Sequence, residues 1–274
     1  MSTRKSKIMV ISSKGGVGKS TLNMQLITPF LYEKNGYNNI AYYEFDNENH
    51  DSLSFANSAL SERNSIDVTS PILREELVNI FSRDEYACFD IGGNRSTSLV
   101  LDALHESAMV HFIDLVVIPL LDGEQDGINA SITYTLLKEM NPDIKVLFVL
   151  NRARNMKYLK YQFENFFGDI RGIFQDKYAV KHYLFEDDIE NFAALLDDDI
   201  IKYSRRFGLT VYEIAKQQRD FIDQLKVQMD ELSSEQEVRM LSFKNYMDRS
   251  SKKYYDDIIK PAFEKIETLL EDRK

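Results

Sequence analysis

A glycine-rich segment near the N-terminus constrains this chain more than any other feature of its sequence. It reads Ser13-Lys14-Gly15-Gly16-Val17-Gly18-Lys19-Ser20-Thr21. The apolar run Ile8–Ile11 precedes it, and a helical pattern that begins at Leu22 follows it. Glycines between a strand and a helix let successive backbone N–H groups point at one anion, and the positive end of the helix assists them. The segment therefore predicts a phosphate-binding loop in an α/β fold.

The loop also predicts individual roles. Lys19 would reach the β- and γ-phosphates of a nucleotide, and the Ser20 hydroxyl would ligate Mg²⁺. The remaining candidate nucleotide-binding residues of the segment are Gly15, Gly16, Val17, Gly18 and Thr21. The usual pattern has a glycine where this chain has Ser13, and a second lysine, Lys14, opens the loop instead.

This form, Lys-Gly-Gly-Val-Gly-Lys-Ser, resembles the deviant Walker A loop of the ParA/MinD family of ATPases. The resemblance implies that Lys14 reaches across a dimer interface to phosphates bound in the partner subunit. It also implies catalytic roles for Lys14 and Lys19, ATP and Mg²⁺ as cofactors, and an ATP-dependent homodimer. In such a protein hydrolysis is slow until a partner, a ParB-like or other adaptor protein, stimulates it.

Short apolar runs alternate with helical patterns up to about residue 150. The expected strands are residues 7–11, 39–45, 86–91, 115–119 and 145–150, with helical stretches near 20–35, 72–82, 97–109 and 126–140. This alternation predicts a doubly wound, mostly parallel α/β sheet flanked by helices, the fold of a P-loop NTPase. Ligands of such sheets bind at the carboxyl ends of the strands.

The regular alternation of strand and helix patterns ends near residue 155. We expect a helix over residues 156–167 and a strand over 181–185. From residue 211 the pattern indicates two or three helices, with breaks near Ser233-Ser234 and Ser250-Ser251. We therefore divide the chain into an ATPase domain, residues 1–213, and a helical C-terminal extension, residues 214–274, that packs on this domain or projects from it.

The second expected strand ends in Glu44-Phe45-Asp46-Asn47-Glu48. ParA-like proteins carry a D-x-D-P-Q signature here, whose second aspartate orients the attacking water. The resemblance places Asp46 in this role, while Glu44, Asn47 and Glu48 depart from the signature. A carboxylate need not be a strong base there, because phosphoryl transfer depends mostly on positioning and on neutralising charge.

Two further strand ends carry candidate residues. Asp90 follows an apolar run and precedes Gly92, a Walker B pattern in which the carboxylate holds Mg²⁺ through water. Gly92 would let the following loop approach the γ-phosphate. Asn151 and Arg152 follow the fifth expected strand, at a position where relatives place an asparagine whose amide hydrogen-bonds to adenine.

Charge and cysteine content limit the partners. The net charge of −10 excludes a global positive field for nucleic acid, so any contact with DNA needs a local basic patch. Arg205 and Arg206 are the candidate DNA-binding residues, beside a basic cluster at Arg152, Arg154, Lys157 and Lys160. The single cysteine, Cys88, fits a reducing cytosol, so we expect a cytoplasmic protein, associated with the nucleoid if DNA is bound.

The resemblance implies an ATP-dependent switch that segregates or positions a plasmid or a protein cargo, with non-specific DNA as its surface. Three alternatives stay open. One is an accessory protein of plasmid transfer that binds proteins only. Another is a MinD-type membrane switch, which the acidic C-terminus disfavours because anionic lipid would repel it. The third is an ATP-dependent ligase of the dethiobiotin synthetase kind, although such enzymes usually lack a lysine at the position of Lys14.

Overall fold

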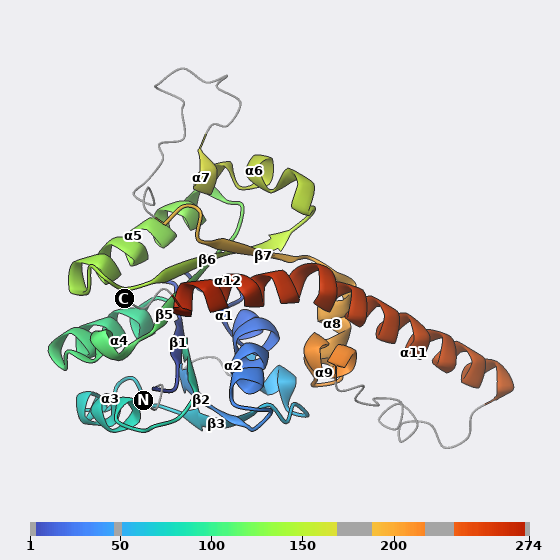
Figure 1. The fold of residues 1–274 in the computed structure, drawn as a ribbon, viewed down its shortest axis with the longest axis horizontal. Coiled ribbons are helices and arrows are strands. Elements are labelled where there is room, and N and C mark those ends of the chain that lie inside the picture. Colours follow the sequence, from blue (N-terminus) through green and yellow to red (C-terminus); the bar gives the residue numbers. More distant parts are fainter. Residues whose placement is uncertain (1–3, 47–50, 169–187, 217–232, 272–274) are drawn as a thin grey trace.

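The computed structural model describes residues 4–46, 51–168, 188–216 and 233–271. Its centre is a sheet of seven strands in the order β3-β2-β4-β1-β5-β6-β7, and all the strand pairs are parallel (Figure 1). The strands are β1 (Lys7–Val10), β2 (Ile40–Phe45), β3 (Ser61–Ser65), β4 (Ala87–Ile91), β5 (Leu115–Leu120), β6 (Val146–Ala153) and β7 (Phe192–Leu196).

Both faces of the sheet are covered by helices. Ile8 and Val10 of β1 belong to the apolar core on one face, and Met9 and the following Ile11 belong to the core on the other. The first face carries α1 (Lys19–Leu22), η1 (Asn23–Ile27), α2 (Thr28–Lys34), α8 (Asp199–Arg206) and α9 (Val211–Lys216). The second carries α3 (Leu73–Phe81), α4 (Arg95–Glu106), η3 (Met109–Phe112), α5 (Glu124–Met140), α6 (Leu159–Gln162) and α7 (Glu164–Phe167). The predicted doubly wound parallel fold is confirmed.

The five predicted strands correspond to β1, β2, β4, β5 and β6. The sequence analysis missed β3 and β7, and the strand predicted over residues 181–185 lies outside the described residues. The helix expected over residues 156–167 is wrong as a single element, because the chain forms η4 (Met156–Tyr158), α6 and α7 there. Phe163 separates α6 from α7 in a non-helical conformation and is fully buried in the apolar core on the second face of the sheet.

The C-terminal helix is continuous over 38 residues, through α11 (Ser234–Tyr254), a π-helical turn η5 (Tyr255–Ile259) and α12 (Lys260–Glu271). Ser233 begins it with a capping box, which confirms the predicted break at Ser233-Ser234. The break predicted at Ser250-Ser251 is wrong. The Ser251 side chain is fully buried in the packed half of the helix, and this packing outweighs the modest cost of serine in a helix.

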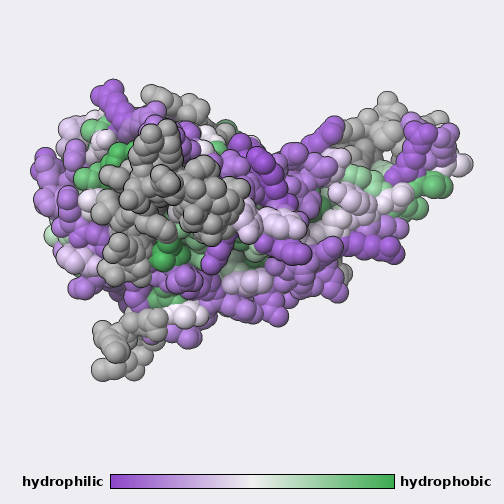
Figure 2. Space-filling model, turned by 90° about the horizontal axis from the view of Figure 1, so that it is seen from above, coloured by the Kyte–Doolittle hydropathy of each residue, from purple (hydrophilic) through white to green (hydrophobic). Residues whose placement is uncertain are grey.

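The two halves of this helix have different surroundings (Figure 1). Residues of α12 such as Ile266 are buried in the core on the first face of the sheet. The N-terminal half of α11 projects from the body and exposes Val238 and Leu241, and Figure 2 shows hydrophobic surface at this projecting end. The domain boundary that we placed at residue 213 falls within α9, and the division stays a prediction. None of the described helices is long and apolar enough to cross a bilayer.

Candidate nucleotide-binding site

The glycine-rich loop connects β1, at the centre of the sheet, to α1. Gly16 and Gly18 have φ angles of 75° and 88°, which residues with a side chain rarely adopt. Gly18 is also the N-cap of α1, so the helix begins directly at the end of the loop. Because α1, η1 and α2 follow one another without a break, a continuous helical segment points its N-terminus at the loop.

Asp90 lies beside this loop because β4 pairs with β1, where it is opposite Val10. Its carboxylate is almost fully buried, accepts a hydrogen bond from the Tyr42 hydroxyl at 2.7 Å, and is hydrogen-bonded to the Ser20 side chain. Burial raises the pKa of Asp90, although the Ser20 and Tyr42 hydrogen bonds and the positive charge of Lys19 oppose this effect. The buried carboxylate therefore lacks full compensation for its charge.

Asp46 and Gly92 come together at the carboxyl ends of β2 and β4. The Gly92 N–H donates to the Phe45 carbonyl oxygen at 2.9 Å. A Cβ at position 92 would lie 2.9 Å from the Asp46 carboxyl carbon, and equally close to Phe45 O and Ser96 Cβ. The close approach of Asp46 to this strand end therefore requires glycine at position 92. Asn47 and Glu48, which continue the predicted signature, lie outside the described residues.

One small cavity of about 70 Å³ gathers most of the predicted site. Its lining consists of Gly15, Gly16, Gly18, Lys19, Ser20, Asp46, Asp90, Gly92 and Gly93. Lys19 is nearly buried and donates to the Lys14 carbonyl oxygen at 3.1 Å, so its ammonium group lies across the loop. The cavity thus combines one cation, two carboxylates and a backbone turn rich in N–H groups.

The donor set of this cavity fits Mg²⁺. A hydroxyl and a nearby carboxylate, Ser20 and Asp90, are the oxygen ligands that this ion prefers alongside phosphate oxygens. The nearly complete burial of the Asp90 carboxylate beside the Ser20 hydroxyl is the observation that favours a cation there. Within the described residues no group of three or more His, Cys, Asp or Glu is placed to hold a metal.

A larger pocket of about 470 Å³ adjoins the cavity, since Gly18 lines both. Its other lining residues are Thr21, Asn151, Arg152, Leu195, Leu196, Asp197, Asp198, Ile201, Lys202, Arg205 and Tyr254. Pockets of this size are typical of small-molecule sites. Residues from α1, β6, β7, α8 and the C-terminal helix therefore enclose the space next to the loop.

Asn151 braces the loop in this structure. Its Nδ2 donates to the Val17 carbonyl oxygen at 2.7 Å, and its Oδ1 accepts from the Arg152 N–H at 3.0 Å. A Cβ at Gly18 would lie 2.4 Å from Asn151 Nδ2, so the two residues are in tight contact. The predicted contact of Asn151 with adenine stays a prediction. The second N–H of Asn151 Nδ2 makes no hydrogen bond to the described residues and is available to donate to the base.

The two predicted DNA-binding arginines lie in different environments. Arg206 is exposed at the end of α8. Arg205 is half-buried, lines the larger pocket, and donates a hydrogen bond to the Thr21 hydroxyl at 3.3 Å. The DNA contact stays a prediction for both residues.

Lys14 forms an ion pair that the sequence analysis did not anticipate. Its Nζ donates to Oδ2 of Asp126, in the first turn of α5, at 2.9 Å. The Asp126 side chain is 5% exposed, whereas that of Lys14 is 36% exposed. The two residues are 112 positions apart, and no motif marks Asp126.

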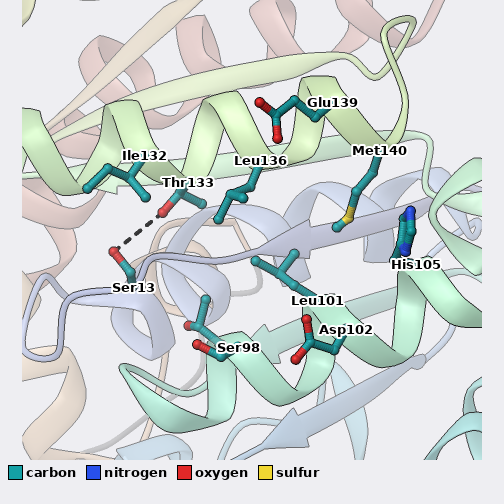
Figure 3. A pocket seen from close by; sticks show the side chains of 11 residues that line it. Ser13, Ser98, Leu101, Asp102, His105, Ile132, Thr133, Leu136, Glu139 and Met140 are labelled. Atoms are coloured by element: carbon teal, nitrogen blue, oxygen red, sulfur yellow. Dashed lines mark hydrogen bonds between the residues drawn. The ribbon is translucent and has the colours of Figure 1, made fainter.

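A groove of about 380 Å³ lies between α4 and α5 and begins at the loop residue Ser13 (Figure 3). Leu101, Leu136 and Met140 contribute apolar side chains to its lining. Thr133 of α5 donates to the Ser13 hydroxyl at 3.5 Å. Ser13, which replaces the usual first glycine of the motif, thus links the loop to α5.

No protein-family model and no curated protein matches the sequence. Among solved structures, the chain is similar to the MinD cell division protein of Aquifex aeolicus, with 15% identity over 83% of this chain and 98% of that chain and a TM-score of 0.47. Apo McdA of Cyanothece matches with 10% identity over 77% and 93% of the two chains and a TM-score of 0.49. A plasmid partition protein of Borrelia burgdorferi matches with 17% identity over 74% and 96% and a TM-score of 0.41. Similarities at this level carry no inference about activity.

Proposed function

We propose that this protein is an ATPase of the ParA/MinD type, in which ATP-dependent dimerisation acts as a switch. The observation that supports it best is the small cavity, which unites the deviant loop with Asp46 and Asp90. The loop follows β1, Asp46 follows β2 and Asp90 lies near the end of β4, so all three come from the carboxyl ends of neighbouring strands. Phosphate binding, Mg²⁺ binding and the positioning of a water molecule would each use residues of this cavity.

In this proposal the loop N–H groups and Lys19 bind the phosphates of ATP, and Ser20 and Asp90 hold Mg²⁺. When bound, Mg²⁺ neutralises charge on the phosphate oxygens. Asp46 orients a water molecule whose oxygen attacks the γ-phosphorus. The bond between this phosphorus and the β–γ bridging oxygen breaks, and the products are ADP and inorganic phosphate.

Contacts between the loop and the segment after Asp90 support the switch. The Asn94 N–H donates to Ser13 O at 2.9 Å, and the Thr97 hydroxyl donates to both Ser12 O and Gly92 O. A γ-phosphate in the cavity would lie between these segments. Its loss would therefore change the contacts of both, as in other nucleotide switches.

The proposed dimer brings two loops face to face, with Lys14 of each subunit on the phosphates of its partner. A ParB-like or other adaptor protein would stimulate hydrolysis and release the dimer in the cytoplasm. The cargo would be a plasmid or a protein complex, and non-specific DNA is the proposed surface. The sequence resemblance alone supports the cargo and adaptor roles.

Molecular mass in solution with ATP and with ADP tests the switch. We expect a dimer with ATP only, and we expect Lys14→Ala to remain monomeric while it still binds nucleotide. Lys260→Ala, which removes an exposed lysine of α12, is the matched control. Asp46→Ala should keep the ATP dimer but slow hydrolysis. A Lys14→Ala protein that dimerises normally with ATP would remove the trans-lysine model.

The proposed DNA surface needs a separate measurement, namely binding to non-specific duplex DNA with ATP and with ADP at two salt concentrations. ATP-dependent binding that weakens as salt rises supports partition on DNA. The absence of binding in both nucleotide states would instead favour a switch that docks on proteins only.

A further inference from the structure

We infer that Arg205 binds the nucleotide itself, at the junction between its phosphates and its nucleoside. The sequence pattern had instead suggested a DNA-binding role for this arginine. The inference rests on the proposed function, because it takes an adenine nucleotide as the ligand.

Arg205 is held in the pocket by contacts on two elements. One guanidinium nitrogen donates to the Thr21 hydroxyl of α1 at 3.3 Å. Another donates to the Ser54 hydroxyl of η2 (Asp51–Phe55) at 3.2 Å, and Cζ lies 5.8 Å from the centre of the Phe55 ring. The planar side chain is therefore pre-organised by hydroxyl groups and an aromatic ring.

Arg205 forms no ion pair with a carboxylate within the described part of the chain. Both of its hydrogen-bond partners are neutral hydroxyls. An arginine has five N–H donors, so the two hydrogen bonds leave three for a ligand. A half-buried guanidinium without a counterion is a site for an anion, because burial of an unpaired charge is costly.

The position of this charge identifies the part of the ligand it meets. Thr21 is in the first turn of the helix that follows the loop, and Gly18 lines both the phosphate cavity and the larger pocket. In a nucleotide that fills both the small cavity and the larger pocket, the phosphate next to the ribose would lie beside Gly18. Arg205 lies on the larger-pocket side of this passage, so we assign it to the α-phosphate.

The rest of the pocket fits a nucleoside rather than more phosphate. Asp197 and Asp198 line it, and their carboxylates would repel an anion but accept hydrogen bonds from hydroxyl or amino groups. Two other cationic residues line the pocket: Lys202 already pairs with Asp199 at 3.0 Å, and Arg152 is exposed near the end of β6. Arg205 thus lies toward the loop and would bind the phosphate of a nucleoside monophosphate. Asp197 and Asp198 lie farther from the loop and would accept hydrogen bonds from the nucleoside.

Binding of ADP, AMP and adenosine, measured by calorimetry, tests this assignment. We expect Arg205→Ala to weaken ADP and AMP about 10- to 100-fold, the usual value of a hydrogen bond to a charged group. Adenosine, which has no phosphate, should lose less than about twofold. Arg205→Lys keeps the charge without the planar fork, so its losses should be intermediate. The control is Arg249→Ala, an exposed arginine of α11.

The outcomes separate the inference from the proposed function. Wild-type protein that binds none of the three ligands refutes both. Wild-type protein that binds ADP with an affinity that Arg205→Ala does not change refutes the inference alone. Loss of duplex DNA binding in Arg205→Ala and Arg206→Ala alike, with ADP affinity intact, would return Arg205 to the DNA surface. If Arg205→Ala lowers the melting temperature strongly, Arg205→Lys decides the result.

Discussion

The ion pair between Lys14 and Asp126 should oppose the proposed dimer. In this structure the Lys14 ammonium group is held on α5 of its own subunit, 2.9 Å from the Asp126 carboxylate. A lysine that reaches the phosphates of a partner subunit must first leave this carboxylate. Asp126→Asn removes the charge that holds Lys14 and keeps the size of the buried side chain. We therefore expect this substitution to favour the ATP-bound dimer.

The geometry of the pair sets the size of the effect. A hydrogen bond between charged groups contributes about 1.5–3 kcal/mol, and solvent screening at the partly exposed Lys14 lowers this to roughly 1–2 kcal/mol. Two such pairs must break for each dimer, which gives about 2–4 kcal/mol. The dimer dissociation constant with ATP should therefore fall roughly 30- to 700-fold in Asp126→Asn.

Sedimentation equilibrium with ATP and Mg²⁺ measures this constant directly. Asp122→Asn is the matched control, because Asp122 pairs with Arg154 at 3.1 Å in a far more exposed setting. Exposed pairs contribute at most about 1 kcal/mol, so the control should change the constant little. If Asp126→Asn and the control dimerise equally, within about threefold of the wild type, the ion pair does not restrain Lys14.

Two further predictions concern the small cavity. Gly92→Ala should slow ATP hydrolysis at least about tenfold with little change in ADP affinity, because the new methyl group displaces the Asp46 carboxyl. Steady-state kinetics measure the rate of hydrolysis, and calorimetry measures ADP affinity. A normal rate would show that the methyl group does not displace Asp46. Burial raises the pKa of Asp90, so its ionised form destabilises the fold at neutral pH and this cost disappears on acidification. Nucleotide-free Asp90→Asn should therefore melt at a higher temperature than the wild type but lose the extra stabilisation that Mg²⁺ gives to the ADP complex, and a lower melting temperature without nucleotide would argue against the charge effect.

The strands that could be predicted are those in the middle of the sheet. β1 and β4 are buried on both faces, so they appear in the sequence as near-continuous apolar runs. β3 is an edge strand of five polar residues that pairs only with β2. Its backbone hydrogen bonds define it, and they leave no apolar pattern. β7 is a short apolar run that contains two alanines, which also favour helix, so periodicity does not distinguish it from a helical segment.

The sequence likewise predicted only some of the residues that meet at the site. Asp46 and Asp90 could be placed near the loop because parallel strands end at one edge of the sheet. Asp126 and Arg205 could not be placed there. Each reaches the loop from a helix on a different face of the sheet, and the contact depends on how that helix packs rather than on a sequence pattern.

The packing of the C-terminal helix connects it to the larger pocket beside the glycine-rich loop. Tyr254, at the end of α11, lines the pocket and donates its hydroxyl hydrogen bond to Leu196 O at 3.0 Å. Leu196 ends β7, just before the acidic residues of the pocket wall, so the helix fixes the strand end that shapes this wall. Beyond Tyr254 toward its N-terminus, the same helix leaves the body and exposes apolar side chains. One helix thus joins the wall of the pocket to an exposed apolar surface.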